Sequence, residues 1–193
     1  KGTMFGFAAD PISKVRVGII GLGNRGNTLL EMFQYLVENE MAEVIALSDI
    51  SEKKVKKAAE KLAVWQSKNP VLYHKSKTEW EKLAKRDDID LVIIATPWDL
   101  HTPMAIYSME NGKHVGSEVP VASTIEDCWK IIETAECTQK HCMMMENCNY
   151  NEEELWVLNM IQEGVFGDIT HTEGAYLHDL RALMLHETYY EGQ

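Results

Sequence analysis

The chain has 193 residues, of which 45% are hydrophobic, so it is long enough to bury the core of one domain and part of a second. Its 30 acidic and 19 basic residues give a formal net charge of -11, which argues against nucleic acid or an anionic membrane as the main partner. No apolar run approaches the roughly 18 to 20 residues that a membrane-spanning helix needs.

Short β-branched runs alternate with helical patterns through most of the chain, which is typical of βα units on a mostly parallel sheet. Helical spacing of apolar residues follows the first two runs, over residues 29–37 and 55–63. We therefore predict a doubly wound α/β fold. Its buried strands are expected at 15–20, 43–47, 91–96, 114–118 and 141–146.

The sequence pattern changes after Asn147, and we place a domain boundary near Cys148. Residues 1–13 are then an amino-terminal extension, 14–148 a first domain and 149–193 the beginning of a second α/β domain. Within the last segment a helix is expected over 152–162 and a strand over 169–179. About 40 residues are too few to close a second core, so we expect the chain to be a fragment of a larger protein.

The segment GLGNRG, from Gly21 to Gly26, lies between the first expected strand and a helix. Its glycines allow the chain to turn tightly and to approach a pyrophosphate closely, while the helix amino terminus faces the phosphates. Taken alone, the motif can also be an ordinary tight turn. The candidate cofactor-binding residues in it are Gly21, Gly23, Asn24, Arg25 and Gly26.

Asp49 ends the second strand in ALSDI, 23 residues after Gly26, where a carboxylate can accept hydrogen bonds from a ribose diol. An acid at this position repels the 2′-phosphate of NADP, so the two motifs together favour NAD. Asp49 can also serve as a helix cap before SEKK. The basic run that follows, Lys53 to Lys57, is expected to form a solvated helix face.

The third strand ends in ATPWDLH, residues 95–101, at the same edge of the expected sheet. We expect Trp98, Asp99, Leu100 and His101 to line the cofactor site there. Two of these residues have an ordinary structural alternative. Taken alone, His101 is more often a satisfied structural histidine, and Trp98 could equally belong to the core.

The fourth strand ends in HVGSEVPVAS and places Glu118 at the carboxyl edge of the sheet, where ligands bind in open α/β sheets. Ser123 and Glu126 fit a capping box, so a helix is expected to start directly after this stretch.

The four cysteines lack a C-x-x-C pair, and we expect buried free thiols rather than a disulfide framework or a zinc site.

The motifs GLGNRG, ALSDI, ATPWDLH and the E-x-P at residues 118–120 together resemble the glucose-fructose oxidoreductase / inositol dehydrogenase / MocA family. That resemblance implies a Rossmann-type NAD domain followed by a second α/β domain with a large open sheet, which is often used for self-association into homo-oligomers. The family's usual third motif is E-K-P, whose lysine takes part in proton transfer. Here Val119 stands in its place and cannot carry a proton, which argues against an ordinary sugar dehydrogenase.

The segments MMMENCNY and GAYLHDLR, with FGFAA near the start, narrow the resemblance to glycoside hydrolase family 109, in which E-V-P replaces E-K-P. These are NAD-dependent α-N-acetylgalactosaminidases, so the implied substrate is a glycan with terminal α-linked N-acetylgalactosamine. The implied mechanism is transient oxidation at C3, deprotonation at C2 with elimination of the aglycone, addition of water and re-reduction. NAD therefore stays tightly bound throughout.

Tyr176 matches the family's catalytic tyrosine, so we expect it to contact the sugar and to act as the base. His178 lies two residues on, on the same face of a strand, where it would assist Tyr176 or contact the sugar. From spacing alone, the two would be a pair on a half-exposed sheet face.

The resemblance also implies further contacts at the ends of two strands. Glu118 and Val119 would lie at the nicotinamide ribose, Asn147 on the nicotinamide side of the cofactor, and Glu146 at the substrate or where it stabilises charge. Without the resemblance, Glu146 and Asn147 would be a turn before a helix.

Two other functions stay open. An NAD-dependent sugar dehydrogenase with a relocated base would accumulate NADH, whereas a non-catalytic NAD-holding sugar binder would show no turnover.

We expect no metal site, since the histidines lack a metal-binding spacing. The chain begins at Lys1 and family members often carry export signals, so we expect a periplasmic or exported protein, with the cytoplasm as the alternative.

Overall fold

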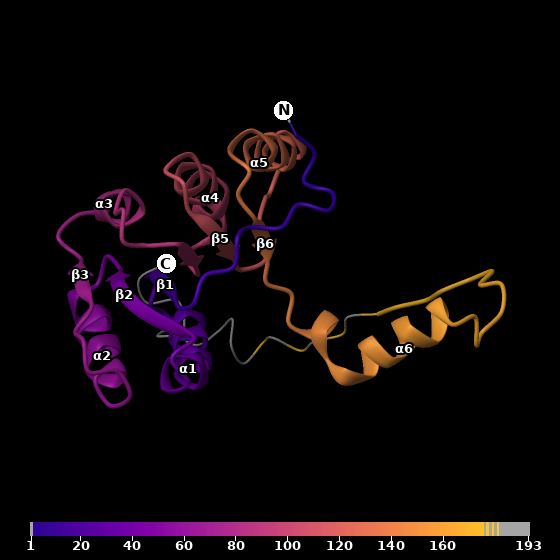
Figure 1. Ribbon diagram of the computed structural model, residues 1–193, viewed down its shortest axis with the longest axis horizontal. Helices are drawn as coiled ribbons and strands as arrows, with labels where there is room; N and C mark the ends of the chain where they lie inside the picture. The colour runs from indigo at the N-terminus through magenta and orange to yellow at the C-terminus, as the bar shows by residue number, and fades with distance from the viewer. Residues whose placement is uncertain (1, 176, 178, 180, 182–193) are drawn as a thin grey trace. The chain divides into compact units, whose positions relative to one another are not determined.

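A six-stranded parallel sheet with strand order β3-β2-β1-β4-β5-β6 lies at the centre of the first of two units, which ends at Met145 (Figure 1). The computed structural model describes residues 2–175, 177, 179 and 181. The predicted Rossmann-type α/β fold is confirmed. The strands are β1 (Val15–Ile20), β2 (Ala42–Ser48), β3 (Val71–Tyr73), β4 (Leu91–Ile94), β5 (His114–Ser117) and β6 (Cys142–Met144).

The five strands expected in the first domain are formed, with ends that shift by at most two residues. The expectation that all five are buried is wrong for β6, where Met143 and Met144 are 47% and 40% exposed at the edge of the sheet. Apolar residues run almost without interruption through the central strands because both faces of the sheet are covered by helices. The edge strand β3 was not expected from the sequence. It has only three residues, and Val71 in it is exposed, so it carries no clear burial pattern.

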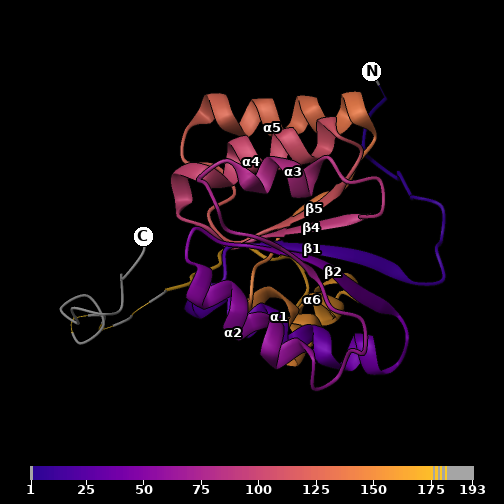
Figure 2. The ribbon, with the colours of Figure 1, turned by 90° about the vertical axis from the view of Figure 1, so that its left-hand side faces the viewer.

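Helices cover the two faces of the sheet in separate layers, with α1 and α2 on one face and α3, α4 and α5 on the other (Figure 2). Each layer encloses its own buried apolar cluster. The short 3-10 turn η1 (Trp98–Leu100) precedes α4. The helices are α1 (Asn24–Glu38), α2 (Glu52–Leu62), α3 (Glu79–Ala84), α4 (His101–Glu110) and α5 (Ile125–Thr138).

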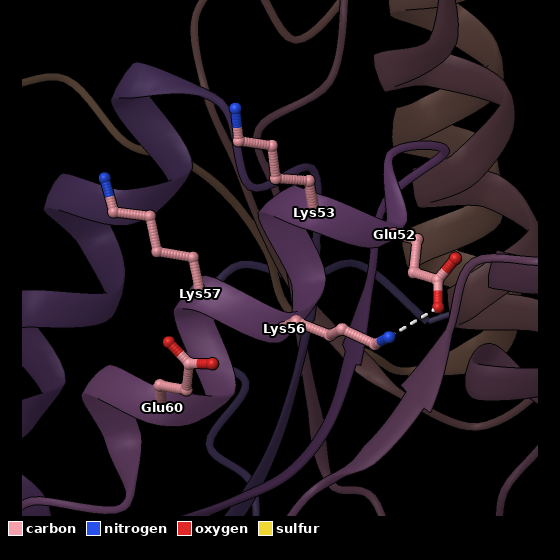
Figure 3. Close-up of a pocket in the computed structure, with 5 residues that line it drawn as sticks. All are labelled: Glu52, Lys53, Lys56, Lys57 and Glu60. Carbon is pink, nitrogen blue, oxygen red and sulfur yellow. Dashed lines mark ion pairs between the residues drawn. The ribbon is translucent and has the colours of Figure 1, made fainter.

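The basic run on α2 forms a solvated helix face, as predicted. Val55 is fully buried against the sheet, whereas Lys53 and Lys57 extend away from the helix (Figure 3). Lys56 Nζ lies 2.7 Å from Glu52 Oε1, one turn away. The shallow hollow on this face is lined by Glu52, Lys53, Lys56, Lys57 and Glu60.

Helix α5 starts directly after the HVGSEVPVAS stretch, as predicted, but the predicted capping box is wrong by one residue. The N-cap is Thr124, whose hydroxyl accepts a hydrogen bond from the backbone N–H of Asp127 at 3.1 Å. Both pairings put a hydroxyl residue three positions before an acid, so the sequence pattern could not separate them.

All four cysteines are free, as predicted, but the prediction that they are buried is wrong for three of them. Cys128 and Cys137 are exposed on α5, and Cys148 is exposed in the second unit. Cys142 in β6 is partly buried, and this burial raises the pKa of its thiol to about 11. The raised pKa lowers the reactivity of Cys142, since the thiolate is the nucleophile.

The second unit begins at Glu146 and contains α6 (Glu152–Gln162), which has the bounds expected from the sequence. The strand expected over 169–179 is not formed over 169–175, where the chain has no regular structure. The described part of this unit holds no other strand with which it could share backbone hydrogen bonds. No helix in the described part of the chain has the length and apolar character needed to cross a membrane.

Candidate functional site

Polar residues gather at the carboxyl edge of the first unit's sheet, where β1, β2, β4 and β5 end. The chain runs from β1 outward to β2 and β3 on one side, and β4 and β5 lie on the other. Such a reversal of strand order between β1 and β4 opens a crevice in which α/β sheets bind their ligands. The segments that follow these strands are residues 21–26, 49–51, 95–101 and 118–121.

Glycine occupies the three glycine positions of GLGNRG for different structural reasons. Gly21 has φ +89°, and a Cβ there would lie 2.5 Å from the carbonyl oxygen of Ala95. A Cβ on Gly26 would lie 1.9 Å from the carbonyl oxygen of Gly21. Gly23, by contrast, has an ordinary φ of -67°, and a Cβ there would meet nothing within 4 Å. The protein's own packing thus does not require Gly23, whereas a ligand lying close to the backbone would.

Helix α1 starts at Asn24, with Gly23 as its N-cap. No side chain caps the helix, and its first turn, which includes Arg25, has no acidic residue. The positive end of the helix dipole and the N–H groups of the first turn therefore face the carboxyl edge. This arrangement suits an anionic group such as a pyrophosphate.

Asp49 connects the end of β2 to the glycine loop. Its Oδ2 accepts a hydrogen bond from the backbone N–H of Leu22 at 2.7 Å, and its Oδ1 accepts one from Ser51 at 2.8 Å. Ser51, and not Asp49, is the N-cap of α2. Each carboxylate oxygen can accept more than one hydrogen bond, so Asp49 retains the capacity to bind a ribose diol.

Asn27 holds the glycine loop from the opposite side and was not predicted from the sequence. Its Nδ2 donates to the carbonyl oxygens of Leu22 at 2.7 Å and Gly23 at 3.0 Å. Among the described residues its Oδ1 is a buried acceptor without a partner, a position suited to a hydrogen-bond donor. An asparagine in the first turns of a helix was the available signal, because that residue type is disfavoured in helix interiors.

Glu118 is 7% exposed at the end of β5, and its Oε1 accepts a hydrogen bond from Arg25 Nε at 2.5 Å. Its backbone N–H donates to the carbonyl oxygen of Ile94 at 2.9 Å. The Arg25–Glu118 pair therefore joins the first turn of α1 to the end of β5, two strands away from β1. Val119, the next residue, is partly buried and has no ionisable group.

His101 is 1% exposed, and each of its ring nitrogens faces a carbonyl oxygen, at 2.8 Å for Pro120 and 2.7 Å for Thr96. This environment is that of a satisfied structural histidine, which was the alternative interpretation of His101. The contact of His101 with a cofactor stays a prediction. Trp98 is 68% exposed, so the core alternative for it is wrong. Asp99 and Leu100 are also exposed at this edge.

The remaining predicted site residues lie elsewhere in the chain. Tyr176 and His178 are outside the described residues. Glu146 and Asn147 begin the second unit. Their predicted roles stay predictions. In the described part of the chain, no group of three or more His, Cys, Asp or Glu side chains is arranged to hold a metal ion.

Two family models match the chain side by side. Residues 15–146 match the oxidoreductase family with an NAD-binding Rossmann fold, and residues 150–193 match the C-terminal domain of glycosyl hydrolase 109. Among solved structures, the chain is similar to the WlbA dehydrogenase from Chromobacterium violaceum in complex with NADH and UDP-GlcNAcA. The TM-score is 0.70 and the identity 27%, over 83% of this chain and 44% of that one. The predicted NAD-binding domain and the resemblance to family 109 are confirmed.

Curated relatives are more similar in sequence. The alpha-N-acetylgalactosaminidase of Bacteroides fragilis is 51% identical over 180 residues, which are 93% of this chain and 41% of that protein. The alpha-N-acetylgalactosaminidase of Shewanella oneidensis is 48% identical over 179 residues, which are 93% of this chain and 38% of that protein. The chain thus spans about two fifths of the length of these relatives.

Proposed function

The chain belongs to the oxidoreductase family with an NAD-binding Rossmann fold, and from this premise we propose that it is part of an NAD-dependent glycosidase. The substrate we propose is a glycan with terminal α-linked N-acetylgalactosamine. One observation carries the proposal: a dinucleotide site with an acidic ribose position is followed directly by a segment of the glycosyl hydrolase 109 type. The similarity to two alpha-N-acetylgalactosaminidases supports the choice of sugar.

The residues of the carboxyl edge fit NAD. The first turn of α1 would hold the pyrophosphate, because Gly23 leaves room for it and no side chain caps the helix. Asp49 would accept hydrogen bonds from the adenosine ribose and would repel the 2′-phosphate of NADP. Glu118, beyond β4, would receive the nicotinamide ribose.

The proposed reaction needs a hydride acceptor that later returns the hydride, so that no net oxidation occurs. NAD supplies this at the sugar C3 when it is bound. The ketone at C3 makes the C2 proton acidic, and a base must then remove that proton before the aglycone leaves. We assign this part to Tyr176. A tyrosine has an ordinary pKa near 10, so it needs assistance at neutral pH, which we assign to His178.

The E-V-P sequence is consistent with proton transfer by Tyr176 and His178. Val119 cannot accept a proton, so the residue beside Glu118 plays no part in proton transfer. We propose that Asn147 binds the nicotinamide side of the cofactor and that Glu146 contacts the sugar. These residues directly follow the first unit, which ends at Met145.

An assay on the complete gene product tests this function. The protein is incubated with an aryl α-N-acetylgalactosaminide, and aryl release is followed together with the absorbance of NADH. The proposal predicts aryl release without accumulation of NADH, and a Tyr176→Phe variant that binds NAD but releases little aryl group. Accumulating NADH without aryl release would instead indicate a sugar dehydrogenase. Binding of the sugar with neither product would indicate a non-catalytic sugar binder.

A further inference from the structure

We propose that Arg25 is a positioning residue: through its ion pair with Glu118 it sets the carboxylate that receives the nicotinamide half of NAD. Arg25 belongs to the GLGNRG motif and lies in the first turn of α1, where an arginine would ordinarily be taken for a phosphate ligand. Its Nε, however, donates to Glu118 Oε1 at 2.5 Å. The inference rests on the NAD site of the proposed function, but it does not depend on the glycosidase reaction.

The direction of the cofactor follows from the sheet order. Asp49 directly follows β2, on one side of the glycine loop, and marks the side of the adenosine ribose. With the pyrophosphate at the first turn of α1, the other half of the dinucleotide must extend to the opposite side, over the ends of β4 and β5. Glu118 lies there, so the Arg25–Glu118 pair spans the crevice between the two halves of the sheet.

The backbone around Glu118 is fixed independently of Arg25. The Glu118 N–H donates to the carbonyl oxygen of Ile94 at 2.9 Å. Two residues further on, the carbonyl oxygen of Pro120 faces His101 Nδ1 at 2.8 Å, and the Val121 carbonyl oxygen accepts from Thr102 Oγ1 at 3.0 Å. Strand β4 and helix α4 thus hold the main chain of this segment. The Glu118 carboxylate itself accepts a long hydrogen bond from the Val119 N–H at 3.4 Å on Oε2 and the short one from Arg25 Nε at 2.5 Å on Oε1, so Arg25 is its stronger side-chain restraint.

The burial of Glu118 makes this contact energetically important. Its side chain is 9% exposed, whereas that of Arg25 is 34% exposed. A buried carboxylate that loses its partner is strongly unfavourable. The planar guanidinium offers donors in fixed directions, which a lysine ammonium cannot reproduce. Arg25 therefore restrains the orientation of Glu118, and the affinity of the nicotinamide end should depend on both residues together.

A double-mutant cycle on the complete gene product tests the proposal, with NAD and ADP as probes. The variants are Arg25→Gln, Glu118→Gln and the double variant, and the dissociation constants are measured by calorimetry after bound NAD has been removed. We expect Arg25→Gln to weaken NAD binding at least about tenfold, the usual scale for breaking a buried charge pair. The double variant should bind NAD no more weakly than the weaker single variant, because contacting residues are not additive.

ADP separates positioning from direct phosphate binding, since it has the pyrophosphate but no nicotinamide ribose. If Arg25 acts through Glu118, Arg25→Gln should leave ADP affinity nearly unchanged. Equal losses for ADP and NAD would overturn the proposal and assign Arg25 to the phosphates. Multiplicative losses of NAD affinity in the double variant, or no loss in Arg25→Gln, would overturn it as well.

Two further variants control for folding. Arg16 forms a comparable pair with Asp90 at 2.6 Å, but this pair lies at the opposite edge of the sheet, where β1 begins. Arg16→Gln should lower stability without changing the NAD dissociation constant. If Arg25→Gln does not fold, the cycle is repeated with Arg25→Lys, which keeps the charge and should retain part of the NAD affinity. In that cycle too, the proposal requires that the double variant with Glu118→Gln binds NAD no more weakly than the weaker single variant.

Discussion

His101 Nδ1 lies 2.8 Å from the carbonyl oxygen of Pro120, so a side chain at the start of α4 holds the segment that follows β5. The other ring nitrogen lies 2.7 Å from the carbonyl oxygen of Thr96. A neutral imidazole has one N–H and can donate to only one of these oxygens, whereas the protonated ring can donate to both. Either way, His101 links the ends of β4 and β5 from a buried position.

Replacing His101 by Phe should therefore destabilise the protein. The substitution removes the ring N–H and leaves at least one of the partly buried carbonyl oxygens of Thr96 and Pro120 without this donor, and an unpaired buried group costs about 1–3 kcal/mol. Urea unfolding of the complete gene product measures the loss. His101→Gln, which keeps one amide donor, should lose less. Equal stability of His101→Phe and the wild type would show that the ring does not hold these strand ends together.

Gly23 and Gly26 should respond in opposite ways to alanine. A Cβ on Gly23 meets nothing within 4 Å, so Gly23→Ala should keep its thermal stability but lose NAD affinity at the crowded pyrophosphate position. Gly26→Ala places a Cβ 1.9 Å from the Gly21 carbonyl oxygen and should lower the melting temperature. Differential scanning fluorimetry and NAD titration check both. Wild-type NAD affinity in Gly23→Ala would mean that the cofactor does not approach this backbone.

Asp49→Ser should change the choice between NAD and NADP. The substitution removes the acceptor for the ribose diol and the charge that repels a 2′-phosphate, so the ratio of NAD to NADP affinity should fall. It also removes the acceptor for the Leu22 N–H, so some loss of stability is expected. Glu60→Gln, an exposed acid on α2, is the charge-matched control. An unchanged ratio of the two dissociation constants would exclude Asp49 from the ribose site.

The stability of α3 should depend on pH through Glu79. Its Oε1 accepts from Lys82 Nζ at 2.9 Å, and its Oε2 accepts from the N–H groups of His74 and Lys75 at 2.9 and 2.8 Å. Lys82 and these N–H groups lower the pKa of the Glu79 carboxyl from 4.5 to about 2. A lowered pKa in the folded state stabilises the protein above pH 4.5, and this contribution is lost as the pH falls through 2.

The variant Glu79→Gln should therefore melt below the wild type at pH 6, and the difference should shrink steadily as the pH is lowered from about 4.5 to 2. Melting temperatures of both proteins across this range give the comparison. Glu110→Gln, at the exposed end of α4, should show no such trend. A difference that stays constant down to pH 2 would show that the Glu79 carboxylate is not stabilised in this way.

The sequence predicted the parts of the fold that depend on local patterns. Continuous apolar runs located five of the six strands, and the glycine loop and Asp49 were placed correctly at the ends of β1 and β2. The three-residue edge strand β3 was missed because it has too little burial to produce a pattern. The N-cap of α5 was predicted at Ser123 and lies at Thr124, because both residues have an acid three positions later and fit the same local pattern.

Contacts between distant residues could not be predicted in the same way. Arg25 and Glu118 are 93 positions apart, and His101 and Pro120 are 19 apart, so their contacts depend on the order of the strands. Strand order also decides which polar strand ends share one crevice, and no single motif contains that information. Asn27 was missed because an asparagine in the first turns of a helix is a weak signal, and its bonds to the carbonyl oxygens of Leu22 and Gly23 exist only in the folded loop.

One measurement tests the proposed glycosidase reaction most directly. The complete gene product is incubated in deuterated water with an aryl α-N-acetylgalactosaminide, and the C2 proton of the released sugar is followed by NMR. We expect aryl release with deuterium at C2 and no accumulating NADH, because the C2 proton is removed and replaced from solvent. Release with the C2 proton retained would contradict the elimination route and would require direct displacement at the anomeric carbon instead.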